Sequence, residues 1–244
     1  MGKADCMSQM EKALIGLRAL IMSGEFEARS RLPEVAISER LGLSRTPLRQ
    51  AMDRLVAEGL LERVKTGGCR VASFDHSDIN DAIELRGVIE GTAVRPAAER
   101  GADPRLIDEA RGLLDAIDTA VSDPENIDFD AYVLLNARFH ETLGRMAGSA
   151  VIQREVERIC KLPLASPSAF LRGQEVIPDF MKSLIRAQSH HRAMLEAIEA
   201  REGARAEAVA HEHARLARQN LAYLKTADPR LATRVPGLSL VTTN

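Results

Sequence analysis

The sequence predicts a mainly α-helical protein built from two modules, and three observations support this prediction. Aromatic residues make up only 3% of the 244 residues and Trp is absent, whereas Ala, Leu, Arg and Glu, which favour helices, are common. Between residues 77 and 225 no run alternates apolar and polar residues as a half-buried strand does. Residues 29–70 hold nine Lys or Arg and five Asp or Glu, a net of +4, within a chain of net charge −2. A basic segment in a slightly acidic chain indicates two modules, the first of which binds a polyanion.

Composition also excludes several classes of protein. No run of about 18 apolar residues is present, so no membrane span is predicted. The N-terminal stretch MGKADCMSQMEKAL lacks the basic and then apolar pattern of a signal peptide. Three cysteines, Cys6, Cys69 and Cys160, have no spacing typical of a disulfide framework. We therefore expect a soluble, cytoplasmic protein.

The first module consists of three helices and a hairpin. Helices are predicted at 9–23, before Gly24, at 33–41, before Gly42, and from Ser44 to Gly59. Two helices joined by a three-residue turn that contains Gly are typical of a helix-turn-helix motif. The segments 60–64 and 69–73, joined around Gly67-Gly68, then predict a β-hairpin with a tight tip. The hairpin makes the motif a winged helix-turn-helix.

The third helix has a cationic face without acidic residues near its start. Its apolar face consists of Leu48, Met52, Leu55 and Val56. Its opposite face carries Arg45, Thr46, Arg49 and Gln50. The second helix of a helix-turn-helix places its N-terminal residues against base edges in the major groove. Arg45 and Arg49, four residues apart, project together and can bond guanine, while Ser44 and Thr46 can reach phosphate or base edges. The alternative is an ordinary solvated face whose arginines pair with neighbouring acids.

The stretch from Arg31 to Ser73 closely resembles the DNA-binding domain of the GntR family of bacterial transcription regulators. The resemblance rests on Arg-Leu-x-Glu, Ser-Arg-Thr-Pro-x-Arg, Glu-Gly-Leu and a glycine-containing wing, and it covers roughly residues 10–73. It implies DNA contacts from Arg45, Thr46, Arg49 and the wing residue Gly68, with Arg31 as a phosphate contact. The family usually has Pro-Gly before its Arg-Leu. This chain has Ala28-Arg29-Ser30 there, which leaves the shape of that turn open.

The second module reads as a bundle of helices. Helices are predicted at 77–101, from 103 to about 121, at 129–148, 150–162, 178–201 and 203–225. Pro96 should bend the first of these helices or divide it at Val94–Arg95. A loop rich in Pro and Ser occupies residues 163–178. The segment 226–244 has no periodicity, and we expect it to be flexible or packed in extended form.

Histidines gather in three helices of this bundle. Five of the six occur as His140, the pair His190-His191, and His211 with His213. Asn136 lies four residues before His140 and therefore on the same helical face. Imidazole suits Zn, Ni, Mn or Fe, and bundles place metal sites on facing helices. The alternative is that these residues are ordinary surface or buried histidines that make hydrogen bonds.

The bundle resembles the FCD ligand-binding domain of the FadR-like branch of the GntR family. ELRGVIEGTAVRPAAERG, NARFHETL and the segment from Ser189 to Leu221 carry the resemblance, which spans roughly residues 77–225. It implies a divalent metal ion, with Zn, Ni or Mn possible, held by Asn136, His140, His191 and His213. His190 and His211 fit this register less well. Asn136 stands where the family frequently has Asp, and a neutral amide is the weaker ligand.

The positions of two histidines along their helices agree with that register. His191 lies eleven residues before Glu202, and His213 lies ten residues after Gly203. If the two helices are antiparallel, both residues lie at about the same height, roughly 15–17 Å from the turn. His190 falls about 100° further round its helix and should not reach the same ion.

The resemblance further implies a small carboxylate effector. Arg86, four residues before Glu90, could pair that carboxylate bidentately, and a structural Arg86–Glu90 ion pair is the equal alternative. We therefore predict a winged helix-turn-helix at 8–74, an effector-binding and dimerisation bundle at 77–225 and a tail at 226–244.

The predicted function is a homodimeric, ligand-responsive regulator that binds double-stranded operator DNA, a repressor in most of the family. The alternatives are a bundle that senses a ligand without metal, and a metal-dependent enzyme that uses a three-His site. Nothing in the sequence supplies a clear general base beside the histidines, so we do not expect an enzyme.

Overall fold

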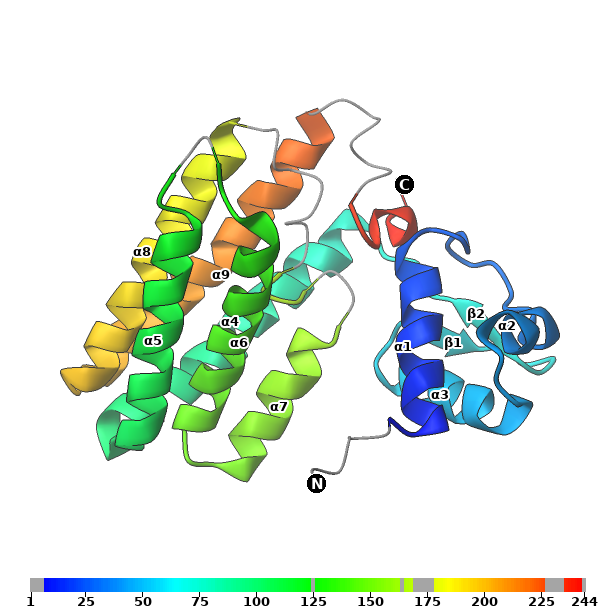
Figure 1. Cartoon of the computed structure of the whole chain (residues 1–244), viewed down its shortest axis with the longest axis horizontal. Coiled ribbons are helices and arrows are strands. Elements are labelled where there is room, and N and C mark those ends of the chain that lie inside the picture. The colour runs from blue at the N-terminus through cyan, green and yellow to red at the C-terminus, as the bar shows by residue number, and fades with distance from the viewer. Residues whose placement is uncertain (1–6, 124–125, 163–164, 169–177, 227–234, 243–244) are drawn as a thin grey trace, which may run out of the picture. The chain divides into compact units, whose positions relative to one another are not determined.

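The computed structural model describes residues 7–123, 126–162, 165–168, 178–226 and 235–242 (Figure 1). The chain divides into two compact units, one made of Met1–Ser77 with Pro236–Asn244 and the other of Asp78–Val235. Helices dominate both units, and the described strands form a single two-stranded sheet. The predicted fold class, a winged helix-turn-helix with an all-helical bundle, is confirmed.

The first unit contains the predicted helix-turn-helix and its wing. Its elements are α1 (Gln9–Met22), α2 (Glu34–Leu41), α3 (Arg45–Ala57), β1 (Leu61–Arg63), β2 (Cys69–Val71) and a 3₁₀ helix, η1 (Leu238–Leu240). A capping box between Ser8 and Glu11 begins α1. Gly42 ends α2 in the left-handed conformation, with φ of +63°, and the chain turns directly into α3. Strands β1 and β2 pair antiparallel with Glu62 opposite Arg70.

An apolar core fixes the position of α3. Leu48 and Leu55 of α3 are fully buried against α1, which contributes the fully buried Leu17 and Ile21. The side of α3 that carries Arg45 and Arg49 is thereby left facing solvent.

The turn that precedes Arg31 contains a residue with a strained backbone conformation. Arg29 has φ of +66°, a left-handed conformation that glycine adopts without cost. Arg29 lies in the Ala28-Arg29-Ser30 segment, where the sequence departs from the family's usual Pro-Gly. The Arg29 N–H donates to Val71 O at 3.0 Å, and its Nε donates to Ser73 Oγ at 3.0 Å. These bonds hold the strained residue in place.

Replacing Arg29 with Gly should stabilise the first unit. Relief of left-handed strain is worth about 1–2 kcal/mol, and the freedom that Gly gains in the unfolded chain returns roughly half of it. We expect a net gain of about 1 kcal/mol, measured as a higher midpoint in thermal or urea unfolding. Arg29→Ala is the control, because it removes the side-chain bond but keeps the strained Cβ. A gain in Arg29→Ala as large as in Arg29→Gly would contradict the strain.

The second unit is a bundle of long helices. They are α4 (His76–Arg100), α5 (Pro104–Ala120), α6 (Phe129–Met146), α7 (Ala150–Cys160), α8 (Pro178–Glu199) and α9 (Gly203–Thr226). Helix α4 continues through Pro96 and is not divided at Val94–Arg95 as one alternative predicted. Val94, Ala97 and Ala98 around the proline are buried. This packing compensates for the backbone hydrogen bond that Pro96 cannot make.

The bundle core brings the candidate ligands together. Helix α5 packs along α6, and α8 packs along α9. Phe139 of α6 and Leu114 of α5 are fully buried in the core, and Leu195 of α8 is nearly so. The short connection at Ala200–Glu202 makes α8 and α9 neighbours, as the sequence predicted. In the described part of the chain no helix is long and apolar enough to cross a membrane.

The described part of the C-terminal segment is packed. Residues 236–242 belong to the first unit and contain the 3₁₀ helix η1, which the sequence did not predict, while Val241 forms a parallel β-bridge with Phe74. Hydrogen bonds to residues far away in the sequence fix this segment, which is why local periodicity gave no signal for it.

Candidate functional site

The start of α3 presents the predicted DNA-contacting residues to solvent. Ser44 is the N-cap residue, but its side chain makes no capping bond. Arg45, Thr46 and Arg49 are exposed beside it. Glu34 of α2 lies between the two arginines, with Arg49 Nε at 2.9 Å and Arg45 Nη2 at 3.7 Å from Glu34 Oε2. The alternative of paired arginines is therefore realised in the DNA-free chain, although such exposed pairs are worth little.

The wing holds the remaining predicted DNA residues. Gly68 has φ of +77°, and a Cβ added there would meet no atom within 4 Å, so its backbone is open to close approach. The Arg31 guanidinium donates to the Thr66 hydroxyl beside the wing tip. Arg31 also forms a β-bridge with Arg70 of β2. The structure thus places these residues in two exposed groups of one unit, the start of α3 and the wing.

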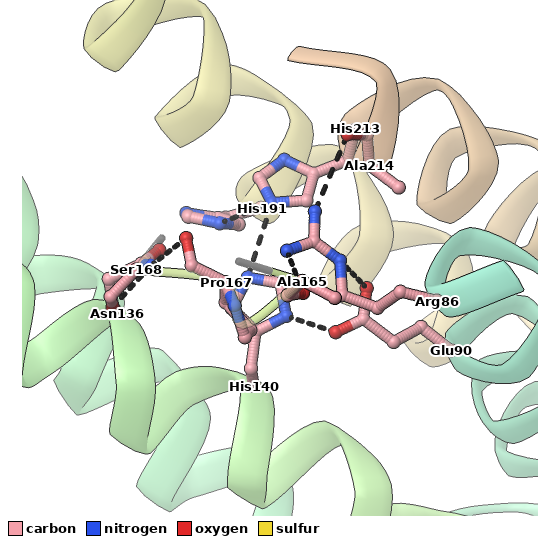
Figure 2. Close-up of polar contacts among 10 residues, drawn as sticks. All are labelled: Arg86, Glu90, Asn136, His140, Ala165, Pro167, Ser168, His191, His213 and Ala214. Atoms are coloured by element: carbon pink, nitrogen blue, oxygen red, sulfur yellow. Dashed lines mark hydrogen bonds and ion pairs between the residues drawn. The ribbon is translucent and has the colours of Figure 1, made fainter. Parts of the chain in front are cut away.

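Three imidazoles converge inside the bundle (Figure 2). His140 of α6, His191 of α8 and His213 of α9 are buried, and their ligand atoms all lie within 4.8 Å of one another. His213 Nε2 lies 3.2 Å from His191 Nε2 and 3.2 Å from His140 Nε2. Nitrogens that each bind one tetrahedral Zn²⁺ at about 2.1 Å lie roughly 3.4 Å apart. The spacing therefore fits a shared divalent ion.

The hydrogen bonds of the outer ring nitrogens fix two of the tautomers. His140 Nδ1 lies 2.8 Å from Glu90 Oε1, and a carboxylate only accepts, so Nδ1 carries the proton. His191 Nδ1 lies 3.0 Å from Gln188 Oε1. The Gln188 amide nitrogen donates to Leu114 O at 3.0 Å and to Asp118 Oδ1 at 2.7 Å, which leaves Oε1 as the acceptor. Both imidazoles thus point a lone pair inward, as metal-binding histidines do.

The protonation states agree with a ligand role. Burial, followed by repulsion from neighbouring imidazoles, lowers the pKa of His191 and of His213 well below the usual value. Both are therefore neutral at neutral pH. Burial opposes ionisation of Glu90, but attraction to His140 and Arg86 outweighs it and lowers the pKa of this carboxyl. The ring nitrogen His213 Nδ1 is buried without a hydrogen-bond partner among the described residues.

Arg86 is a buried cation next to the histidines. Its Nη1 donates to Ala165 O at 3.0 Å and its Nη2 to Ala214 O at 3.4 Å. Arg86 Nε lies 3.6 Å from Glu90 Oε2, too far for a hydrogen bond, and has no other partner in the described structure. The predicted ion pair with Glu90 is present, and it leaves part of the guanidinium unused.

Asn136 lies in the same interior, but its described contacts go elsewhere. Asn136 Nδ2 donates to Pro167 O at 3.2 Å and to Ser168 Oγ at 3.4 Å. No described contact joins its amide to the three imidazoles. The three predicted histidine ligands are thus brought together, and Asn136 lines the same small chamber as His213. His190 and His211 lie outside the group, and the His211 ring packs against Gly91 instead.

Two cavities flank the histidines. A chamber of about 20 Å³ is lined by polar side chains from four elements, including Arg86, Asn136, Ser183 and Asn220. Ser183 Oγ donates to Asn220 Oδ1 at 2.8 Å. A larger cleft of about 470 Å³ lies between α6 and α7 and reaches His140. Pro167 lines both cavities and so lies between them.

The cleft also contains a thiol that is not a ligand. Cys160 lines its wall, and burial raises the pKa of this thiol to about 12. The group is therefore a neutral thiol at neutral pH and a poor ligand.

Several residues of these sites were not singled out by the sequence analysis. Gln188 precedes His191 by one helical turn, a spacing that predicts a shared face. Asn220 follows His213 by two turns, and Ser183 precedes His191 by eight residues, so both share the histidine faces. Glu34 was visible in the Arg-Leu-x-Glu pattern, but its position opposite Arg49 depends on how α2 and α3 pack.

A winged helix-turn-helix with an exposed arginine face, joined to a helical bundle with a polar interior, defines a DNA-binding regulator. Residues 11–71 match the model of bacterial regulatory proteins of the gntR family, and residues 81–216 match the FCD domain. The chain belongs to the GntR family of transcriptional regulators, in the FadR-like branch that carries an FCD domain. The predicted resemblance is confirmed.

Relatives and solved structures agree with this assignment. The chain is 27% identical over 195 residues to the HTH-type transcriptional repressor GlaR of Escherichia coli, covering 79% of this chain and 86% of that protein. It is 30% identical over 184 residues to a probable D-xylose utilization operon transcriptional repressor of Paenarthrobacter nicotinovorans, covering 71% and 74%. The E. coli McbR/YncC structure superposes with a TM-score of 0.64 at 19% identity over 90% of this chain and 98% of that one, which shows the fold. Because these proteins are regulators, the prediction that the chain is not an enzyme is confirmed.

Proposed function

We propose that the chain is a ligand-responsive repressor that binds operator DNA as a homodimer and senses a small hydroxylated carboxylate in its bundle. The observation that carries the proposal is the convergence of three imidazole nitrogens beside the buried cation Arg86. Transcriptional repressors are among the named relatives, which supports the direction of control.

His140, His191 and His213 would hold a divalent metal ion, Zn or Ni by ligand type. Neutral imidazoles leave the charge of the ion uncancelled, so the bound ion would attract an anion. Glu90 and Gln188 orient two of these ligands through their hydrogen bonds. Asn136 could offer its amide oxygen as a fourth, weaker ligand, because its bonds to Pro167 and Ser168 use only the amide nitrogen.

The chamber beside the metal site indicates the class of effector. Arg86 lines this chamber as a buried cation, and its charge would attract a carboxylate. Asn220 accepts from Ser183 through its oxygen, so its amide N–H groups are the donors left for a ligand hydroxyl. A volume of about 20 Å³ has room for about one water, so the chamber would have to open for any acid, and least for a short one. A short hydroxy acid fits this set of donors best.

The experiment is a thermal-shift comparison on the metal-loaded protein. Lactate, glycerate and tartrate are compared with propionate, succinate and benzoate at equal concentrations. We expect only hydroxy acids to raise the melting midpoint, because binding to the folded state stabilises it by about 2.7 kcal/mol at 100 times Kd. The shift should shrink in Asn220→Leu and persist in Arg154→Ala, a control at an exposed position of α7 outside both cavities. No shift with any acid would reject the effector proposal, and equal shifts with propionate would reject the role of Asn220.

We further propose that the chain forms a homodimer. One recognition helix reads only a few base pairs, so genomic specificity needs two half-sites. Leu85 and Val88, three residues apart on α4, are 50% and 48% exposed and form an apolar surface suited to self-association.

Light scattering on the wild type should give twice the mass of the chain at micromolar concentration. Leu85→Glu should shift the protein to monomer, since a charge is placed in the apolar contact. Leu134→Glu is the matched control, because Leu134 is 62% exposed on a different helix, α6. A wild-type monomer with and without DNA would contradict the homodimer.

A further inference from the structure

The last described segment of the chain, residues 236–242, is built into the DNA-binding unit. Its Gly237 N–H donates to Met22 O, at the end of α1, at 2.8 Å. The Phe74 N–H, just after the wing, donates to Leu240 O at 2.9 Å, and the Thr242 N–H donates to Phe74 O at 2.8 Å. These bonds connect the segment to both the first helix and Phe74, which follows the wing. We call residues 236–242 the C-terminal strap.

The strap also completes the apolar core of that unit. Leu240 is 0% exposed and packs in the same cluster as Leu17 and Ile21 of α1 and Leu48 of α3. Its neighbour Ser239 is exposed. Leu240 lies more than 160 residues after the other core residues in the sequence, yet it is buried among them. The strap is therefore an integral part of the folded unit.

The strap gives the DNA-binding unit a second covalent connection to the bundle. One connection follows Ser77 and leads into α4, and the other leads from α9 back into the strap. Because α1 packs directly on α3, a contact that fixes the end of α1 also restrains the recognition helix. Undocking of the strap would remove this restraint and open the core at Leu240.

We infer that docking of the strap is energetically coupled to operator binding, so that the winged helix-turn-helix reads DNA with full affinity only when residues 236–242 are in place. The inference concerns DNA binding, which the family establishes, and does not depend on the proposed metal or effector. By linkage, operator DNA must stabilise the docked strap by the same factor by which the strap strengthens DNA binding.

The first test compares two neighbouring substitutions in the full-length protein. Leu240→Asp places a charge in the core and should undock the strap, whereas Ser239→Asp adds the same charge at an exposed position. The probe is a duplex selected from a random library on the wild-type protein. We expect Leu240→Asp to weaken binding at least tenfold and Ser239→Asp to bind like the wild type. Leu240→Ala keeps the core apolar, and its affinity for the duplex should lie between those of the two charged variants. It tests the same contact if Leu240→Asp unfolds the whole unit.

The second test separates coupling from a purely structural role. Hydrogen exchange is measured on the wild type with and without the selected duplex, at the amides of Phe74, Gly237 and Thr242, which make the docking bonds. Coupling predicts slower exchange at these amides when DNA is bound, although they lie on a different element from the α3 arginines. Unchanged exchange there, or wild-type affinity in Leu240→Ala and Leu240→Asp alike, would overturn the inference.

Discussion

In the His191→Ala variant we expect the divalent metal, about one ion per chain in the wild type, to be lost, while His190→Ala retains it. His191 Nε2 faces His213 Nε2 at 3.2 Å, and its lone pair is directed inward by the bond from Nδ1 to Gln188. His190 lies outside the group of ligand atoms although it is the adjacent residue. Removing a direct ligand should cost more than the roughly 10- to 100-fold in affinity that second-shell changes cost.

The measurement is elemental analysis of purified wild type and the two variants, followed by titration of Zn²⁺ or Ni²⁺ into chelator-treated protein. Metal should also raise the melting midpoint of the wild type and of His190→Ala but not of His191→Ala, because only binding to the folded state stabilises it. Retention of metal by His191→Ala together with its loss from His190→Ala would show that the register is wrong. Metal-free wild type that cannot be loaded would leave the alternative in which the bundle senses its ligand without a metal.

The local features of this protein could be predicted because their signals are local. Pro and Gly at helix boundaries, together with helical periodicity, define helices α1 to α9 within a few residues. The i,i+4 spacing of Asn136 and His140 likewise places both residues on one face of their helix. The wing followed from two short apolar runs around a glycine pair.

The orientation of side chains could not be predicted in the same way. Asn136 lies on the face of His140, yet its described amide bonds go to Pro167 and Ser168 because these residues come from another segment. Glu90 was recognised as a partner of Arg86, and the structure shows that it also bonds His140. Such a double role depends on how α4 packs against α6, which sequence spacing within one helix does not encode.

Contacts between distant segments and unusual backbone conformations could not be predicted from the sequence either. The strap pairs Leu240 with Phe74, two residues separated by most of the bundle, so no window of sequence contains both. Arg29 adopts φ of +66° although arginine is not a residue that favours this conformation. Only the family pattern pointed to that position, and it left the shape of the turn open.

Arg49→Ala should weaken specific operator binding by about 1–3 kcal/mol, roughly 5- to 150-fold, if Arg49 reads a guanine. Arg49 is exposed one turn after the start of α3, where helix-turn-helix proteins contact base edges. Its ion pair with Glu34 at 2.9 Å joins a 59% exposed arginine to a partly exposed acid, and such pairs are worth only about 0–1 kcal/mol. A bidentate contact with guanine can therefore displace Glu34.

The matched control is Arg54→Ala, which removes the same charge from the same helix. Arg54 is 52% exposed and pairs with Glu58 at 3.0 Å, near the C-terminal end of α3 and away from the residues expected to meet bases. Binding is measured at fixed salt on the selected duplex and on a random duplex, because phosphate contacts weaken both alike. If Arg49 contacts bases, Arg49→Ala should lose affinity mainly for the selected duplex. Arg54→Ala should lower the affinity for both duplexes slightly and equally. An equal loss on both duplexes in Arg49→Ala would assign this arginine to the phosphate backbone, and the reading of bases would then fall to Arg45.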